Sequence, residues 1–361
     1  MLLIARAPVR ISFGGGGTDI PAYYERYGGF VVSTTINYYV YTILTPGQPD
    51  GVQTFSADYR SFTQRPICED LIWDGDLSLP KAIVYYFNVR DGLTVFLASQ
   101  VPPGTGLGSS GSVAVSMIKA LAFWCGLDLG PREVAELACF IEINKLEMPV
   151  GKQDQYAAAF GGLNCYIFLR DEVRVEPLRM PPQARQALEQ GLMLFFTGIS
   201  RQSSTILKRQ QEASRQGDPE TVRRLTAIKE LGLEIRRALE TGDFQTFGEL
   251  LHRSWVEKRG VVEGITNPHL DRCYEAARQA GALGGKVTGA GGGGFLMLYC
   301  PPERQDAVTE ALTALGLQRR PFALEEEGVQ ILQGIPWTRS SPRYPFGTLP
   351  HLVGTESGTL S

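Results

Sequence analysis

Long hydrophobic runs are missing from this sequence, and so is a strong excess of charge of either sign. No apolar run approaches the roughly 20 residues that cross a bilayer, and Arg6 interrupts the apolar start, Met1–Ala5, before it is long enough for a signal segment. The formal net charge is −3, and no basic stripe carries interleaved aromatic residues. We therefore expect a cytoplasmic protein with no nucleic-acid partner and no membrane partner.

Histidine is scarce, and cysteine occurs in no metal-binding pattern. The three histidines form no HExxH-like spacing, and the six cysteines form no CxxC pair. Unpaired cysteines in apolar segments are expected to be buried free thiols. These absences argue against a zinc site and a histidine-dependent triad. Carboxylates, hydroxyls and basic side chains are left to carry the chemistry.

The length and the pattern of elements indicate a mixed protein. The 361 residues, 43% hydrophobic and 20% charged, suffice for two domains or one large one. Strand and helix patterns alternate around apolar segments, which predicts an α+β fold. A change of unit at Met180–Gln183 divides the chain into predicted domains 1–180 and 185–335. Residues 336–361, rich in Pro, Ser, Gly and Thr, are predicted to form a tail.

A glycine-rich loop, Val101–Ser112, lies between an apolar strand over residues 93–98 and a predicted helix that contains Val113. Glycines let a backbone approach a ligand closely, and the first turn of a helix offers free N–H groups and the positive end of its dipole. Together these features favour a phosphate site. The plain alternative is a strand-to-helix turn capped by serine. The loop is neither a Walker A motif nor a GxGxxG fingerprint.

Two further glycine-rich stretches lie before and after that loop. Glycines 14–17 separate Arg10 from Asp19, which indicates either a small-ligand pocket or a surface ion pair on a glycine turn. Glycine-rich residues 289–294 lead into a β-rich run. Three such stretches, each beside a strand, favour a polyanion site lined by backbone groups.

Two carboxylates occur on predicted helices. Glu142 lies on a helix predicted over residues 131–145, where a solvated surface position is the plain interpretation. Asp154 lies near the start of a short alanine-rich helix, where the plain interpretation is an N-cap. Neither residue is assigned a reaction by its local pattern alone.

Taken together, three motifs resemble those of the GHMP kinases, the superfamily of galactokinase, homoserine kinase, mevalonate kinase and phosphomevalonate kinase. They are Ala7–Arg10, Pro103–Ser110 and Lys286–Gly294, within a match that covers about residues 4 to 300. The resemblance implies an α+β, two-domain fold. Its N-terminal, ATP-binding domain would be like ribosomal protein S5 domain 2, its C-terminal domain would be ferredoxin-like, and the site would lie between them.

Within the superfamily, residues 6–19, 151–162 and 281–292 look like the sugar-kinase branch that includes D-glycero-D-manno-heptose 7-phosphate kinase. This branch implies an ATP- and Mg²⁺-dependent transfer to the anomeric hydroxyl of a heptose 7-phosphate, giving the 1,7-bisphosphate for nucleotide-activated heptose. The alternatives are a kinase for a free sugar such as L-fucose and a non-catalytic sugar or nucleotide sensor. Galactose is disfavoured, because glycines occupy the positions of a Glu-His pair in galactokinase. A homodimer is compatible with the resemblance.

The resemblance also implies roles for single residues. Asp154 would take the proton of the sugar hydroxyl, and Arg10 would stabilise charge beside it. Ser110 and Glu142 would bind magnesium, which needs few protein ligands. The ATP phosphates would lie on the loop residues Pro103, Gly104, Thr105, Gly106, Leu107, Gly108, Ser109 and Ser110.

The sugar would be held at the first glycine turn. By resemblance Asp19 contacts sugar hydroxyls, and Gly16, Gly17 and Thr18 surround it. A sugar phosphate also needs cations, for which the candidates are Arg201, Lys258 and Arg259; their plain interpretation is as cations that favour the end of a helix. A structural role is expected for the third glycine stretch, at Gly289, Gly291, Gly292 and Gly293.

Overall fold

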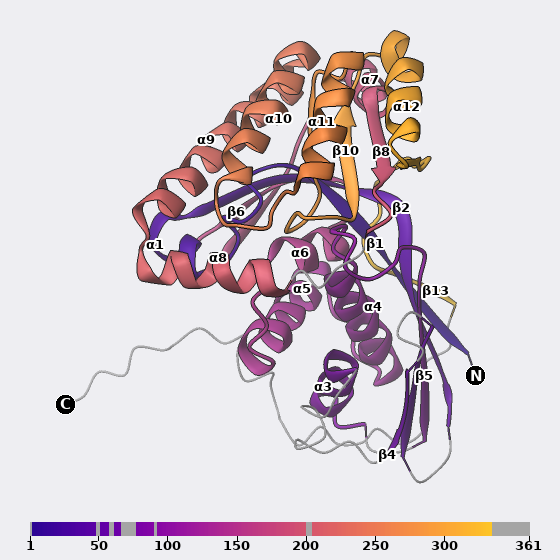
Figure 1. Cartoon of the computed structure of the whole chain (residues 1–361). Coiled ribbons are helices and arrows are strands. Elements are labelled where there is room, and N and C mark those ends of the chain that lie inside the picture. Colours follow the sequence, from indigo (N-terminus) through magenta and orange to yellow (C-terminus); the bar gives the residue numbers. More distant parts are fainter. Residues whose placement is uncertain are drawn as a thin grey trace, which may run out of the picture.

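The computed structural model describes residues 2–47, 51–57, 61–65, 77–89, 92–199 and 204–333. Arg201 and the tail predicted from residue 336 onward lie outside the described residues. Figure 1 shows two groups of elements, one above the other, with the long strands β1 and β2 passing between them. The two groups correspond to the two sheets described below.

The first sheet contains nine strands in the described part of the chain, in the order β13-β1-β2-β5-β3-β4, with β12 and β6 also paired to β2 and β7 paired to β6. All of these pairs are antiparallel except β3 with β5. The strand bounds are β1 Leu3–Gly14, β2 Gly29–Pro46, β3 Val52–Ser56, β4 Ser61–Arg65, β5 Leu93–Ser99, β6 Leu163–Phe168, β7 Val173–Pro177, β12 Leu324–Glu325 and β13 Gln330–Gln333.

Strand β1 contributes apolar side chains to two hydrophobic cores. Its apolar residues before Pro8 pack in the core beneath the first group of helices, and those after Pro8 pack in a core shared with the second group. The pairing of β1 with β2 shifts register between Pro8 and Val9. This shift is the irregularity expected at a proline, which cannot donate to a strand ladder.

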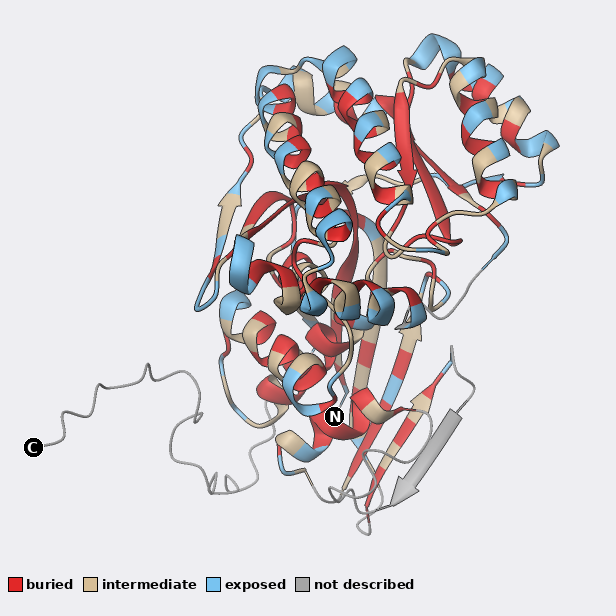
Figure 2. Cartoon of the chain, turned by 60° about the vertical axis from the view of Figure 1, so that its left-hand side comes forward, coloured by how far each residue is buried: buried red, intermediate tan, exposed pale blue. Residues whose placement is uncertain are grey.

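Helices cover one face of the first sheet, and their apolar sides turn inward, as the red surfaces in Figure 2 show. The amphipathic pattern of the sequence explains this burial, because residues three and four apart share a helix face. These elements are α1 Pro21–Tyr27, α3 Ser78–Tyr86, α4 Ser109–Trp124, α5 Pro131–Cys139, the π-helix η1 Phe140–Lys145 and α6 Gln153–Phe160.

The second sheet has four antiparallel strands within the described residues, in the order β11-β8-β10-β9. When the four strands are numbered 1 to 4 along the chain, from β8 to β11, their order in the sheet is 4-1-3-2. Helices follow strands 1 and 3. This is the ferredoxin-like arrangement that the resemblance implied. The elements are α7 Pro182–Gly191, β8 Leu192–Phe196, α8 Ser204–Gln216, α9 Pro219–Thr241, α10 Phe244–Arg259, α11 Pro268–Ala280, β9 Gly284–Val287, β10 Phe295–Tyr299, η2 Pro302–Arg304, α12 Gln305–Ala314 and β11 Gln318–Arg319.

Local signals account for several helix ends in this second group. Asp218, Asp243 and Asn267 accept hydrogen bonds from backbone N–H groups in the first turns of α9, α10 and α11. Capping of this kind satisfies donors that have no partner inside the helix. Asp and Asn are preferred at this position, so the sequence itself marks where these three helices begin.

The described chain differs from the sequence-based expectation in several elements. Helices α1 and α7 and the short strand β9 were not predicted; β9 begins in a glycine pair that resembles a loop. The helix predicted over residues 131–145 is α-helical only to Cys139 and continues as a π-helix. Strands β12 and β13 fall in the predicted range 185–335 but pair with β2 and β1 of the first sheet.

No helix among the described residues is both long enough and apolar enough to span a membrane.

Candidate active site

A cavity lies where the two groups of elements meet. Its walls come from the end of β1 and the turn after it, the glycine loop before α4, the start of α6, and the helices α8 and α10. The lining residues are Arg10, Gly17, Asp19, Ile20, Gly104, Gly106, Gly108, Ser109, Ser110, Val150, Gly151, Gln153, Asp154, Leu207, Gln210, Lys258, Gly289 and Ala290. All three glycine-rich stretches of the sequence therefore contribute to one cavity.

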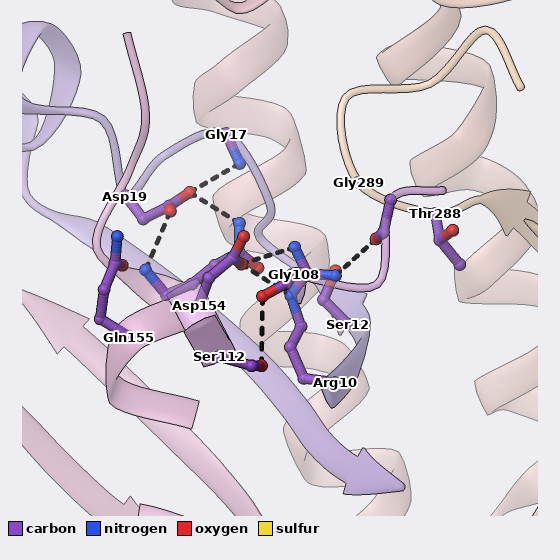
Figure 3. A network of polar contacts seen from close by, with 12 residues as sticks. Arg10, Ser12, Gly17, Asp19, Gly108, Ser112, Asp154, Gln155, Thr288 and Gly289 are labelled. Carbon is purple, nitrogen blue, oxygen red and sulfur yellow. Dashed lines mark hydrogen bonds and ion pairs between the residues drawn. The ribbon is translucent and has the colours of Figure 1, made fainter. Parts of the chain in front are cut away.

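Arg10 and Asp154 form an ion pair in this cavity (Figure 3). The guanidinium Nη2 lies 2.6 Å and Nε lies 2.8 Å from Oδ1 of Asp154, and Nη1 donates to the Gly106 carbonyl at 2.6 Å. Arg10 is 3% exposed, so it is not part of the surface ion pair with Asp19 that was one alternative. Asp154 makes no side-chain cap of α6. One cation thus joins a carboxylate to the glycine loop.

The glycine loop leads directly into helix α4. Gly104, Gly106 and Gly108 all have left-handed φ angles, between 74° and 80°, which favour glycine. Gly108 is the N-cap, and none of the serines caps the helix with its side chain, so the serine-cap interpretation is wrong. Ser112 instead donates to the carbonyls of Pro8 and Gly108. The free N–H groups at the start of α4 therefore have no side-chain cap and are available to an anion.

Three predicted loop residues do not line the cavity. Thr105 and Leu107 are fully buried; the Thr105 hydroxyl donates to the Pro102 carbonyl, and the Leu107 carbonyl accepts from the Arg10 backbone N–H. Pro103 is also absent from the lining. These residues shape the loop, whereas the glycines, Ser109 and Ser110 face the cavity.

The third glycine stretch packs directly on this loop. A Cβ at Gly289 would lie 2.5 Å from Cα of Gly106, and one at Gly294 would lie 2.1 Å from the Thr105 carbonyl oxygen. Neither position has room for a side chain. Gly291 and Gly293 pack on backbone atoms of Ile265 and Ile199. The Gly292 N–H donates to the Ile265 carbonyl.

Ser110, Glu142 and Gln155 form a second polar group beside the loop. The Ser110 hydroxyl donates to Oε1 of Glu142 at 2.9 Å, and the Gln155 amide donates to Oε2. Glu142 is fully buried, which contradicts the solvated-surface interpretation. Burial raises the pKa of Glu142 to about 7 and the Asp154 charge adds to the rise, while hydrogen bonds from Gln155 and Ser110 oppose it.

This group fits a magnesium ion. Hydroxyl and carboxylate oxygens are hard ligands, and a cation would offset the burial of a carboxylate that has only neutral donors. Among the described residues no cluster of three or more His, Cys, Asp or Glu could hold a metal. Magnesium uses few protein ligands when phosphate oxygens supply the remaining ones.

Asp19 lies at the first glycine turn, 2% exposed. Its Oδ1 accepts from the Gly17 N–H at 3.0 Å and from the Gln153 side chain at 3.1 Å, and its Oδ2 accepts from the Gln153 N–H at 3.2 Å. Burial raises the pKa of Asp19 and the Asp154 charge raises it further, while the backbone hydrogen bonds lower it. Thr18 does not line the cavity; its hydroxyl donates to the Gly15 and Phe30 carbonyls. Gly16 is also outside the lining.

Of the two predicted phosphate-binding cations that the structure describes, Lys258 reaches the cavity and Arg259 does not. Lys258 is 8% exposed and donates to the Gly289 carbonyl. Burial and the Arg10 charge lower the pKa of Lys258 to about 8, against the charges of Asp19 and Asp154. Arg259 pairs with Asp271 at 3.2 Å and does not line the cavity. Arg201 lies outside the described residues.

Sequence reasoning assigned no role to three residues at this site. Lys286 is 2% exposed, lies 3.3 Å from the Ser12 hydroxyl and has a pKa lowered well below its usual value, mainly by burial. Gln153 and Gln210 line the cavity. Lys286 and Gln153 stand inside motifs that were singled out. Gln210 stands in α8, outside every motif of the sequence, so no local signal identified it.

Comparison with known proteins agrees with this arrangement. The model of the GHMP kinases N terminal domain matches residues 78–162, and that of the GHMP kinases C terminal region matches residues 235–317. A D-glycero-alpha-D-manno-heptose 7-phosphate kinase from Campylobacter jejuni is 35% identical over 332 residues, covering 90% of this chain and 97% of the relative. These matches show an ATP-dependent phosphotransferase. The chain belongs to the GHMP kinases.

Solved structures give the same result. A D-glycero-D-manno-heptose 1-phosphate kinase from Bacteroides thetaiotaomicron matches with a TM-score of 0.75 and 30% identity, over 93% of this chain and all of that one. Lactococcus lactis galactokinase in complex with galactose also has a TM-score of 0.75, over 92% of this chain and 95% of that one; at 18% identity it shows the shared fold alone. The predicted two-domain GHMP kinase fold is confirmed.

Proposed function

We propose that this GHMP kinase phosphorylates the anomeric hydroxyl of D-glycero-D-manno-heptose 7-phosphate to give the 1,7-bisphosphate. The observation that carries the proposal is the Arg10–Asp154 pair, which contacts the phosphate loop directly and shares one cavity with the buried cation Lys258. Sequence similarity to the C. jejuni heptose 7-phosphate kinase supports the choice of sugar.

In the proposed reaction the proton of the anomeric hydroxyl passes to the Asp154 carboxylate. The sugar oxygen forms a bond to the γ-phosphorus of ATP, and the bond from that phosphorus to the bridging oxygen breaks, releasing ADP. Such transfers need mainly positioning and charge stabilisation. Arg10 meets both needs, because it donates to Asp154 and to the Gly106 carbonyl of the loop.

Ser110 and Glu142 would hold magnesium, which supplies positive charge to the ATP phosphates when bound. Gln155 keeps the Glu142 carboxylate in place through its side-chain amide. The backbone of Gly104, Gly106 and Gly108 would lie against the phosphates, since glycine permits the closest approach.

Among the described residues, Lys258 is the predicted cation that lines the cavity, and it would bind the phosphate already present on the sugar. It lies at the end of α10 and reaches the same cavity as Asp19. Arg259 instead forms an ion pair with Asp271. Asp19 would orient the sugar, as the resemblance to galactokinase implies.

The test is a screen of ADP release with heptose 7-phosphate, heptose 1-phosphate, L-fucose, mannose and galactose. Both heptose phosphates are included because the two relatives described above are named for different phosphate positions. Phosphorus NMR of the product identifies the hydroxyl that received the phosphoryl group. We expect turnover with heptose 7-phosphate and a new anomeric phosphate. Turnover with a free sugar and none with heptose 7-phosphate would overturn the proposal.

A further inference from the structure

Helix α8 supplies part of the cavity wall from the second half of the chain. Leu207 and Gln210 line the cavity, and Ile206 is buried in the core around the second sheet. The helix packs against α1 and α9, beside α1 as Figure 1 shows. Its position is therefore held by core contacts, and Gln210 is presented at the glycine turn after β1.

Gln210 is fixed at one end of its amide. The side chain is 5% exposed, and Nε2 donates to the Gly17 carbonyl at 3.0 Å. Because a carbonyl can only accept, this bond determines which end of the amide is nitrogen. The other end, Oε1, accepts no hydrogen bond from the described residues and, unlike the Gln153 amide oxygen, is not among the buried polar atoms that lack a partner. Gln210 thus brings an amide oxygen to the wall of the cavity.

Gly17 makes this placement possible. It has a φ of 101°, and a Cβ there would lie 2.8 Å from Nε2 of Gln210. Gln210 therefore occupies the volume that a side chain at position 17 would take. At this part of the site the glycine turn leaves space, and the side chain that fills it comes from α8.

Gln153 is a second amide residue that lines the cavity. Its Nε2 donates to Asp19, which fixes the amide orientation, and its Oε1 is buried without a partner among the described residues. Both oxygens of Asp19 already accept hydrogen bonds from Gly17 and Gln153. A buried acceptor without a partner costs stability, about 1–3 kcal/mol in typical cases.

We propose that Gln210 is a specificity-determining residue that touches the sugar, with its Oε1 accepting a hydrogen bond from a non-reacting hydroxyl. The inference rests on the proposed function, since it requires a polyhydroxylated substrate in this cavity. The reacting hydroxyl gives its proton to Asp154, so Gln210 recognises a different one. An acceptor-only group distinguishes a substrate that has this hydroxyl from an analogue that lacks it.

The experiment compares the wild-type protein with Gln210→Met, which keeps the length of the side chain and removes both polar atoms. We expect KM for the sugar to rise about tenfold, the effect of one lost hydrogen bond, with KM for ATP unchanged. Gln216→Met, an exposed change at the end of the same helix, is the matched control and should alter neither constant. KM does not depend on the fraction of folded enzyme, so partial unfolding does not imitate the result.

A set of monodeoxy sugar analogues locates the hydroxyl. The wild-type protein should lose about tenfold in kcat/KM with one analogue, and Gln210→Met should not distinguish that analogue from the parent sugar. Equal increases in KM for sugar and ATP, or the same pattern of deoxy effects in both proteins, would overturn the inference. The wild-type screen tests the proposed function separately, and the Gln210 comparison is made on whichever sugar that screen identifies.

Discussion

At the scale of single residues, the site depends on a buried cation with two tasks. Arg10 donates to Asp154 and to the Gly106 carbonyl, and it is almost completely buried. An arginine keeps its charge in such a position, and its planar fork can address two acceptors at once. The proposed base and the phosphate loop are therefore held in fixed relation by one side chain.

The first prediction at this scale concerns Asp154. Asp154→Asn keeps the size of the side chain and removes the proton acceptor, so kcat should fall by about 10²- to 10⁴-fold, the usual contribution of a general base. ATP affinity, measured by calorimetry, should stay within a few-fold, because the loop is unchanged. A variant with near-normal kcat would exclude Asp154 as the base.

The second prediction concerns Lys258 and pH. Burial lowers its pKa to about 8, so the side chain is charged below that pH and neutral above it. If it binds the sugar phosphate, kcat/KM for that substrate should fall as pH rises above about 8, because kcat/KM reports the free enzyme. At pH 7, kcat/KM of the Lys258→Met variant for the sugar phosphate should be about 10- to 100-fold below the wild-type value, the usual range for a lost charged hydrogen bond. The kcat/KM of this variant should not fall further as pH rises above 8.

The control for Lys258 is Lys208→Met, an exposed change on α8. It should retain the wild-type profile between pH 7 and 9. A profile for Lys258→Met that still falls above pH 8 would assign the titration to another group.

At the scale of elements, two glycine stretches distant in sequence form one packed unit. The loop before α4 and the segment between β9 and β10 approach so closely that backbone meets backbone. This contact joins the two groups of elements beneath the phosphate loop. Glycine is required there both for its φ angles and for the absence of a side chain.

Replacement of Gly289 tests this contact. Gly289 has a φ of 62°, and its Cβ would lie 2.5 Å from Cα of Gly106. Gly316 has a φ of 88° with nothing within 4 Å, so Gly316→Ala isolates the cost of the backbone angle. We expect Gly289→Ala to lose about 1–3 kcal/mol more unfolding free energy than Gly316→Ala, the range for overpacking. Its KM for ATP should also rise. Equal urea unfolding curves for the two variants would contradict this account.

At the scale of the whole molecule, the chain returns to its first sheet after completing the second. Strands β12 and β13 pair with β2 and β1, and the segment between them packs on the end of α6, the helix that carries Asp154. The Glu325 carbonyl accepts from the Gly162 N–H and from the Thr35 hydroxyl. The segment between β12 and β13 therefore packs against α6, the helix that carries the proposed base.

Gly328→Ala tests this return. A Cβ there would lie 2.1 Å from the Ala159 carbonyl oxygen, which is backbone and cannot move aside cheaply. The free energy of unfolding, measured with urea, should fall by about 1–3 kcal/mol. Glu326→Ala, which breaks an exposed pair with Arg185, should cost at most about 1 kcal/mol. A Gly328 variant as stable as the Glu326 variant would show that the contact relaxes.

Much of the fold followed from local signals. Strand alternation, helix periodicity and caps such as Asp243 gave most elements, because each depends on neighbours in the sequence. Helices α1 and α7 and strand β9 were not predicted, nor was the change from α- to π-helix before Glu142. The domain limits at 180 and 185 stay a prediction. The pairing of β12 depends on a strand about 290 residues earlier, and β13 pairs with β1 at the start of the chain, which no local pattern reports.

The sequence by itself determined where backbone must pass without side chains, and so where phosphate could bind, because glycine adopts positive φ angles without strain and permits the closest backbone approach. It also supplied the charged residues and, by resemblance, their roles. Only the tertiary structure decided which of them meet. Arg10 reaches Asp154 across 144 positions and Gln210 reaches Gly17 across 193, whereas Arg259 turns to Asp271. The physical reason is that a buried polar group takes the partner that packing places beside it, and packing is a property of the whole chain.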